Sequence, residues 1–499
     1  MYRKEETGDT GKRSACDKRI RYSCLEAEKE KSKKRQKIRK ETSVRGVEMI
    51  QKVHTSLSEI KEYMNTILPI QESFDLVERS IWVGGKEGVF YFVDGLLKDE
   101  SMVKIMTAFF AVKEQDLPED AETFAKKCIP CVEVDIVTDF EEIVKGILSG
   151  VLALFIDGYE SCIMIDCRTY PARSVDEPEK DKSLRGSRDG FVETVVFDTA
   201  LIRRRLRDPQ LVMEMLEVGS SSRSDVVLCY MKQRVDAKLL MNVRKKIREV
   251  KTEDLCMNQQ SLAEALMGTR WYNPFPKFKF TERPDTTAAC LMEGKVAVLV
   301  DNSPSAMILP TSVFDMIEEA NDYYFPAWTS LYLKFSRVLI LILTVFLTPV
   351  FLLLMQNPQW IPPAFEFVAV KDTVNIPLVY QLLLLELVID GLRLAALSTP
   401  NMLSTPLSIF AGLVLGEFSV NSGWFNPEVM LYMAFVAVAN YTQPNFELGY
   451  AVKFMRMLIL ILTALFNWGG FLAGCVILLL LLCTNRTLSG RNYLNLSMK

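Results

Sequence analysis

Three ionisable residues share one face of an apolar segment in the last third of the sequence. Glu386, Asp390 and Arg393 are spaced by four and three residues, so a helix projects their side chains to the same side. A charge at the centre of a bilayer costs about 2.5–3.5 kcal/mol on insertion scales, so such residues need partners or water. One interpretation is an ion or solute path, with Glu417 in the next apolar run as a fourth member. The other is a structural ion pair of Arg393 with Glu386 or Asp390.

A second concentration of charge lies at residues 185–193, which read Arg-Gly-Ser-Arg-Asp-Gly-Phe-Val-Glu. The glycines permit turns, and the helix expected over 191–207 leaves backbone N–H groups at its start that can bind an anion. The spacing matches neither a P-loop nor a dinucleotide-binding motif, so a structural junction is favoured over anion binding. The candidate residues are Arg185, Gly186, Arg188, Asp189, Gly190 and Glu193 in the loop, and Arg203, Arg204 and Arg205 in the helix.

The sequence contains little that favours enzymatic or metal chemistry. Cys128 and Cys131 form a C-x-x-C pair, but adding Cys162 and Cys167 as further zinc ligands gives a loose spacing with no nearby histidine. His54 is the only histidine, and no nucleophile stands at a recognisable spacing from it. We therefore predict neither catalysis nor a metal or other cofactor.

Charge and composition exclude further classes. The net charge of −3 over 499 residues argues against a nucleic-acid-binding protein. Residues 1–46 form a basic tail without apolar periodicity, which we expect to be disordered. It is either attracted to anionic lipid headgroups or is a solvated tail or an overextended start of the reading frame. It has no apolar export signal, so the hydrophilic part is expected in the cytoplasm with its cysteines reduced.

The hydrophilic part is predicted to hold two mixed α/β subdomains, over residues 47–168 and 185–325, joined by a Pro-rich and charged linker at 169–184. Helical periodicity at 47–65 and 139–149 alternates with β-prone runs, and a hairpin is expected where Gly84 and Gly85 separate two of them. The second subdomain repeats this mixed pattern. Its similarity to the first is too weak to indicate a duplication.

Residues 331–485 are predicted to form a transmembrane helical domain of about five segments, followed by a short tail at 486–499. The fifth apolar run is interrupted at residues 467–470, so it is either one tilted helix or two half-helices. Five crossings would place the basic C-terminal tail opposite the soluble part, whereas a broken fifth run, or a third and fourth run that form a re-entrant pair, returns it. The apolar runs are Leu331–Met355, Pro377–Ser398, Leu403–Val420, Pro427–Tyr441 and Phe454–Cys483.

Ordered motifs along residues 50–485 resemble one known family. The loop and helix at 185–209 are followed by Asn-Pro-Phe-Pro at 273–276, Thr-Glu-Arg-Pro-Asp at 281–285, Asp-Asn-Ser-Pro at 301–304 and Asn-Asp-Tyr-Tyr at 321–324. In this order they are similar to the A subunits of GerA-type spore germinant receptors. Within that family the runs at 185–209 and 300–311 are most similar to the stage V sporulation protein AF subfamily.

The resemblance implies a multi-pass protein of the inner spore membrane that forms a homo-oligomer, a ring of five, and releases monovalent cations during germination or amplifies that response. It also implies partners: B- and C-type receptor subunits, or a small membrane protein. Glu386 and Asp390 would then line a pore. The alternative function is a non-conducting scaffold that transmits a signal, and a secondary transporter is less favoured because no inverted repeat is visible.

Overall fold

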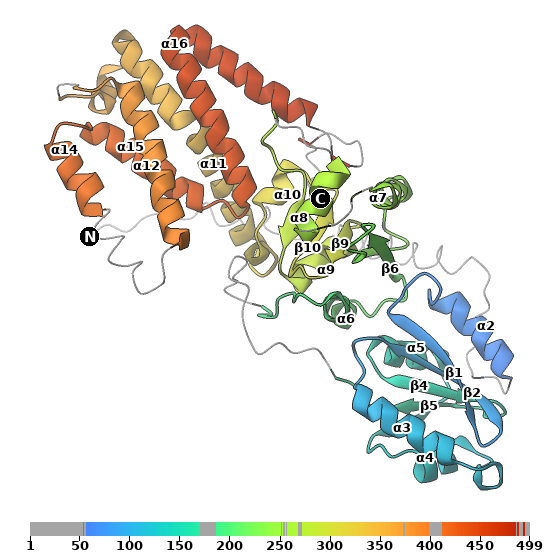
Figure 1. Ribbon diagram of the computed structural model, residues 1–499. Coiled ribbons are helices and arrows are strands. Elements are labelled where there is room, and N and C mark those ends of the chain that lie inside the picture. The colour runs from blue at the N-terminus through green and yellow to red at the C-terminus, as the bar shows by residue number, and fades with distance from the viewer. Residues whose placement is uncertain are drawn as a thin grey trace, which may run out of the picture. The chain divides into compact units, whose positions relative to one another are not determined.

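The computed structural model describes residues 56–169, 186–250, 257–267, 272–372, 375–398 and 412–485, together with residues 53, 252, 255, 487, 488, 493 and 494. The basic tail at 1–46, His54, Arg185, nearly all of the predicted linker and the start of the third apolar run lie outside these residues. Two five-stranded antiparallel sheets and a set of long apolar helices make up the described chain (Figure 1).

The first sheet has the strand order β1-β2-β4-β5-β3. The predicted hairpin is present, since β1 pairs with β2 in register across Gly84 and Gly85, both of which have positive φ. Helices α3 and α4 pack on one face, and α2 and α5 on the other, so β4 is buried along its whole length. The elements are α2 (Leu57–Ile67), β1 (Leu76–Val83), β2 (Lys86–Val93), α3 (Asp99–Ala111), α4 (Ala121–Cys128), β3 (Val134–Val137), α5 (Phe140–Leu148), β4 (Leu152–Ile156) and β5 (Cys162–Ile165).

The second sheet has the order β6-β7-β9-β10-β8, with α7 and α8 on one face and α6 and α9 on the other. Strand β9 is again fully buried, which explains its uninterrupted apolar sequence. The elements are α6 (Val195–Arg205), β6 (Leu211–Val218), β7 (Ser224–Met231), α7 (Ala237–Glu249), α8 (Asn258–Met267), β8 (Lys279–Thr281), α9 (Pro284–Met292), β9 (Val296–Val300) and β10 (Ala306–Leu309).

The two sheets are structural repeats of one another, because helices and strands follow in the same order and the strands connect in the same way. We call them the first repeat (α2 to β5) and the second repeat (α6 to β10). A capping contact is repeated as well. Asp157 Oδ1 accepts a hydrogen bond from the first N–H of α2, on Leu57, and Asp301 Oδ1 from the first N–H of α6, on Val195, both at 3.2 Å. The sequence pattern alone did not indicate this duplication.

Short segments lead from the second repeat into the apolar helices. A five-residue helix, α10 (Val313–Ile317), and a 3₁₀ turn at Ala320–Tyr323 precede α11 (Ala327–Gln356). Helix α12 (Leu378–Ser398), a π-helical turn at Leu413–Phe418, α14 (Ser419–Asn421), α15 (Pro427–Tyr441) and α16 (Phe446–Thr484) follow. Of the described helices, α11 and α16 are long and apolar enough to cross a membrane, with mean hydropathies of 2.9 and 2.2 in their most apolar windows.

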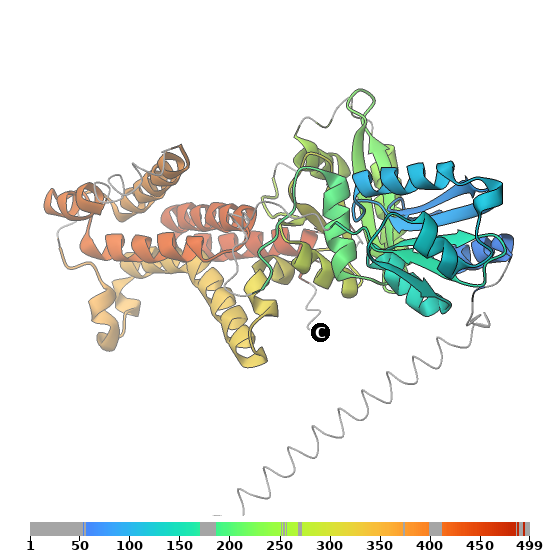
Figure 2. The ribbon, with the colours of Figure 1, turned by 90° about the horizontal axis from the view of Figure 1, so that it is seen from below.

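Helix α16 is a hairpin of two half-helices, which is one of the two alternatives the sequence left open. Asn467 leaves the helical conformation, with φ 52° and ψ −131°, and the chain reverses there. A Cβ on Gly470 would lie 1.8 Å from Leu462 O, and one on Gly474 would lie 3.1 Å from Ile459 Cα. The two limbs therefore pack closely along their glycines, side by side in both views (Figures 1 and 2).

Both ends of the α16 hairpin return to the second repeat. Asn273 Nδ2 donates to Leu481 O at 3.4 Å near the end of the second limb, and Tyr493 beyond it is buried and donates to Pro276 O at 2.7 Å. The turn of the hairpin instead meets the end of α11, where Asn357 Nδ2 donates to Asn467 Oδ1 at 2.6 Å. Whatever path the intervening helices take, the chain comes back to the side from which α11 departs.

Candidate functional site

Four buried or half-buried charges meet between α12 and the first limb of α16. Arg456 donates to Glu386 Oε1 from Nε at 2.8 Å, and its Nη2 lies 2.6 Å from the same oxygen. Lys453 forms an ion pair with Asp390 and lies 3.7 Å from Glu386. We call these four residues the charge cluster. Its two acids and two bases are formally neutral together, which lowers the cost of placing them among apolar helices.

Helix α11 also contacts the charge cluster, because Arg456 Nη1 donates to Thr344 O at 3.2 Å. The hydroxyl of Thr344 donates to the carbonyl of Ile340 one turn earlier, while its own carbonyl accepts from Arg456. The side chains of Glu386, Lys453 and Arg456 are at most 5% exposed, whereas Asp390 is 34% exposed. Asp390 is therefore the member of the cluster that opens to the outside of the bundle.

The structure brings only two of the four candidate intramembrane residues together. Arg393 does not pair with Glu386 or Asp390, because α16 presents two cations, Lys453 and Arg456, to those carboxylates. The ion pair of Arg393 with Glu386 or Asp390, which was one of the two interpretations left open by the sequence, does not form. Glu417 is exposed and makes no ion pair with any residue that the structure describes. The sequence did hold a signal for the true partners: two basic residues three positions apart at the start of the fifth apolar run.

Arg393 lies among aromatic rings one helical turn beyond the charge cluster. Its guanidinium carbon is 5.0, 5.7 and 5.2 Å from the ring centroids of Tyr441, Phe446 and Tyr450. These distances fall in the range of cation–π contacts. The rings come from the end of α15 and the start of α16, so Arg393 joins three helices at the end of the bundle that faces the second repeat.

Arg203 anchors the first repeat to the second. Its side chain is fully buried and forms a bidentate ion pair with Asp75, from Nε at 2.8 Å and from Nη2 at 3.1 Å. Ser73 accepts from the same guanidinium at 3.3 Å, and the N–H of Phe74 donates to Met213 O at 3.0 Å. The residues that precede β1 are therefore held against α6 and the edge strand β6.

The loop before α6 is held by its own chain. Arg205 donates to Asp189 Oδ2 at 2.5 Å and to Ser187 Oγ at 2.9 Å, and Arg283 donates to Ser187 O at 2.7 Å. Burial raises the pKa of Asp189, but the hydrogen bonds from Arg205 and Ser187 outweigh it and lower the pKa below its ordinary value. The loop is thus tied both to α6 and to the Thr-Glu-Arg-Pro-Asp motif.

Tyr324 brings a third motif to the same place. Its hydroxyl donates to Asp285, which is also paired with Arg283 at 2.6 Å. Gly186 has φ +108°, and a Cβ there would lie 2.3 Å from Cζ of the Tyr324 ring, so a glycine is required. Asn-Asp-Tyr-Tyr leads directly into α11, where Arg337 pairs with Asp322 and donates to Ile317 O at 2.6 Å. Motifs that are far apart in the sequence therefore meet where the loop, the second repeat and the start of α11 contact one another.

The start of α6 is occupied by carboxylates of the chain itself. The helix begins at Val195 rather than at residue 191, because Asp198 accepts from the N–H of Val192 at 2.8 Å and Asp301 from that of Val195. Burial, opposed by the Val192 hydrogen bond, raises the pKa of Asp198 to about 8. These contacts favour the structural-junction interpretation of the motif over anion binding.

The remaining candidates of this motif differ in their exposure. Arg188, Glu193 and Arg204 are exposed, and Gly190 is buried. The backbone carbonyl of Glu193 accepts from the N–H of Asn302 at 2.7 Å, which adds a second link to the turn that carries Asp301. No group of three or more metal-ligating side chains gathers among the described residues. Burial, with Cys131 nearby, raises the pKa of Cys167 to about 12, so this thiol stays protonated.

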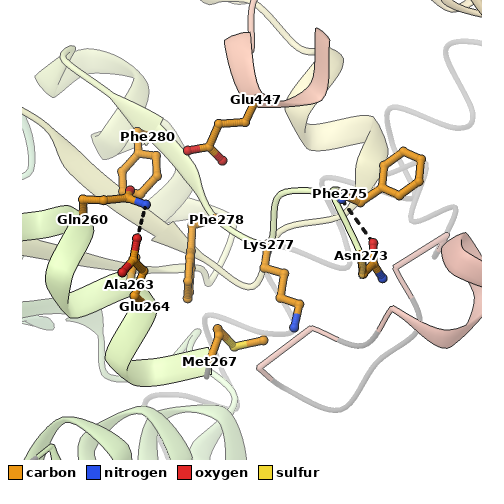
Figure 3. A pocket seen from close by; sticks show the side chains of 10 residues that line it. All are labelled: Gln260, Ala263, Glu264, Met267, Asn273, Phe275, Lys277, Phe278, Phe280 and Glu447. Atoms are coloured by element: carbon orange, nitrogen blue, oxygen red, sulfur yellow. Dashed lines mark hydrogen bonds between the residues drawn. The ribbon is translucent and has the colours of Figure 1, made fainter. Parts of the chain in front are cut away.

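A groove of about 220 Å³ lies where the second repeat meets the start of α16 (Figure 3). Phe275, Phe278 and Phe280 supply apolar surface, and Glu264 and Glu447 face it with carboxylates. Gln260 Nε2 donates to Glu264 Oε1 at 3.1 Å across part of its wall. The groove marks a contact between the soluble and apolar parts of the chain at which both contribute charged side chains.

Comparison with known proteins decides the family. A family model described as Bacillus/Clostridium GerA spore germination protein matches residues 59–499. This chain belongs to the GerA family. It is 31% identical to stage V sporulation protein AF of Bacillus subtilis (strain 168), over 88% of this chain and 89% of that protein. It is 26% identical to spore germination protein A1 of the same organism, over 86% and 89% of the two chains.

This GerA-family chain also matches a solved structure, the N-terminal domain of the A subunit of the Bacillus megaterium spore germinant receptor GerK3. The match covers 52% of this chain and 95% of that domain, with 21% identity and a TM-score of 0.39. Family membership confirms the resemblance seen in the sequence motifs, including the similarity to stage V sporulation protein AF. It supports a role in spore germination.

Proposed function

We propose that this GerA-family protein is a multi-pass protein of the inner spore membrane and a subunit of an oligomeric, pentameric channel that releases monovalent cations during germination. The charge cluster carries the proposal. Its three buried members hold α11, α12 and α16 together, and its fourth, Asp390, stands partly exposed beside Gly391 on the outer side of α12. In a ring, each protomer would contribute one such carboxylate, and a ring of carboxylates favours cations.

The membrane placement is supported by the surface of the helices. Large apolar side chains remain exposed along them, as lipid contact requires and water disfavours. They include Leu339, Leu387, Leu465 and Leu479. Tyr493 binds Pro276 of the second repeat, so the end of the described chain lies beside the repeats. The sequence from 486 to 499 contains basic residues and no acidic ones, which by the positive-inside rule supports the proposal that this side faces the cytoplasm.

Single-channel recording of the purified full-length protein in planar bilayers tests the proposal. We expect a cation-selective current from wild type and a clearly smaller cation conductance from Asp390→Asn, which removes one charge per protomer and little volume. Glu366→Gln is the matched control, because Glu366 is an exposed carboxylate on the connection between α11 and α12, away from the charge cluster. Equal conductance of wild type and Asp390→Asn would remove Asp390 from the pore.

One observation favours the alternative of a non-conducting scaffold that joins B- and C-type subunits or a small membrane partner. The charge cluster is neutralised within a single chain, so it stabilises the bundle without any pore. A purified oligomer of defined mass that passes no current in the same bilayers would establish this second function and overturn the first.

A further inference from the structure

Arg393 is a buried cation, and no carboxylate of the described residues pairs with it. It is 8% exposed, and its Nε atom is buried with no hydrogen-bond acceptor. The acids on its own helix are committed elsewhere, Glu386 to Arg456 and Asp390 to Lys453. The stretch that follows α12, residues 399–411, contains no Asp or Glu in its sequence. The side chains of Tyr441 and Tyr450 hydrogen-bond to the guanidinium, and the aromatic rings attract its charge, but neither group supplies a counter-charge or an acceptor for Nε.

The same end of the bundle holds another unsatisfied polar side chain. Gln443, in the connection between α15 and α16, is 7% exposed, and neither atom of its amide has a hydrogen-bond partner. It lies in sequence between two of the rings around Arg393, those of Tyr441 and Phe446. Buried groups of this kind normally have partners, so the unsatisfied Nε of Arg393 and the unsatisfied amide of Gln443 indicate that polar groups from outside the described chain complete this end of the bundle.

The surface around Arg393 is apolar and open. Leu394, Tyr441, Phe446 and Phe454 are each more than half exposed. A free anion would approach through water, whereas an acyl chain would lie along these side chains and bring its phosphate to the guanidinium. Tyrosines at the headgroup level are typical of membrane proteins, and the planar guanidinium binds phosphate oxygens in a bidentate way.

We propose that Arg393, with Tyr441, Phe446 and Tyr450 around it, binds the phosphate of an anionic phospholipid in the leaflet on the side of the second repeat. The inference goes beyond the proposed function. It rests on the membrane placement but not on conduction. The net negative headgroup is required because the buried cation has no other counter-charge among the described residues.

Native mass spectrometry measures the binding. The full-length protein is kept in detergent with one defined lipid added, and the detergent is removed in the instrument. With phosphatidylglycerol we expect one tightly retained lipid per protomer, and with phosphatidylcholine none. Arg393→Gln should weaken retention about tenfold, the effect of losing one charge-assisted hydrogen-bonded contact. Arg393→Lys should retain an intermediate amount, because a point charge remains without the planar donor pair. Lys334→Gln, which removes an ion-paired cation at the start of α11, should bind as wild type.

A second measurement needs no variant. The unfolding temperature of wild type in nanodiscs should rise when phosphatidylglycerol replaces part of the phosphatidylcholine, and inorganic phosphate should not reproduce the rise. Equal retention of the two lipids by wild type, or stabilisation by inorganic phosphate alone, would overturn the lipid site. A protein that is recovered in buffer without detergent would instead overturn the membrane placement on which the proposed function depends.

Discussion

At the residue scale, Arg456 links three of the apolar helices. It pairs with Glu386 on α12 and donates to the backbone of Thr344 on α11, while its own side chain is 2% exposed. Removing one partner of a buried pair leaves an uncompensated charge, which typically costs about 3–5 kcal/mol, whereas replacing both can be nearly neutral. The contribution of the pair is therefore best measured by changing both residues.

We expect Arg456→Gln to lower the unfolding temperature of the detergent-purified protein sharply, and Glu386→Gln to do the same. The double substitution should recover much of the loss, because no charge then stays unpaired. Asp390→Asn is the comparison, since the Asp390 side chain is 34% exposed and Lys453 keeps Glu386 as a counter-charge at 3.7 Å. If the losses of the two single changes simply added in the double, the pair would not be coupled.

Asp198 predicts a dependence of stability on pH. Burial raises its pKa to about 8 in the folded chain, well above the value of a carboxyl in an unfolded chain. The folded state then holds a proton that the unfolded state releases, so the contribution of Asp198 to the free energy of unfolding is complete at low pH. This contribution is lost as pH rises toward 8, by about 1.4 kcal/mol per pH unit.

Thermal unfolding of wild type and Asp198→Asn from pH 5 to pH 8 measures this effect. We expect the unfolding temperature of wild type to fall with rising pH by more than that of Asp198→Asn, which does not titrate. Parallel curves would show that Asp198 is ionised in the folded protein.

At the element scale, the close contact at Gly470 determines the α16 hairpin. Gly469→Ala should be tolerated, because a Cβ there meets no atom within 4 Å, whereas Gly470→Ala should open the turn, because its Cβ would collide with the backbone of Leu462. Both variants replace a glycine by alanine, at neighbouring positions, so each is a control for the other. Their abundance in membranes and their unfolding temperatures measure the difference, and equal behaviour would contradict the hairpin.

The sequence predicted most helices and strands but few of their partners. Two β-prone runs separated by paired glycines predicted the hairpin of β1 and β2, and the interruption at residues 467–470 allowed a hairpin in α16 as one alternative. Helical spacing assigned Arg393 to the carboxylates of its own helix, because spacing describes one helix and carries no information about a second. Lys453 and Arg456 lie more than sixty positions later, and only the packing of α16 on α12 brings them there.

At the scale of the whole molecule, the sequence did not reveal the duplication. A strand buried on both faces needs apolar residues, but many different apolar sequences meet this need. Asp157 and Asp301, which cap equivalent helices, are a polar feature that the two repeats share.

The arrangement of the apolar helices can be tested directly with single cysteines in a cysteine-free chain. They replace Met241 in the second repeat, Gln359 beyond α11 and Leu494 beyond α16.

In intact cells, a membrane-impermeant maleimide should label the cysteine at position 359, because the end of α11 and the turn of α16 lie together away from the second repeat. Positions 241 and 494 should react only after the membrane is made permeable. Labelling of position 494 in intact cells would place the C-terminal residues opposite the second repeat and contradict the return of α16.

The charge cluster also sets an order for biosynthesis. Under the proposed membrane placement, α12 leaves the ribosome carrying Glu386 and Asp390, while Lys453 and Arg456 are still to be made. A lone helix with these acids enters lipid at a cost of several kcal/mol, so α12 must wait at the insertion machinery or in a protein-lined path until α16 arrives. Completion of the bundle is thereby linked to completion of the chain, and a protein truncated before α16 would be left with a helix that the membrane rejects.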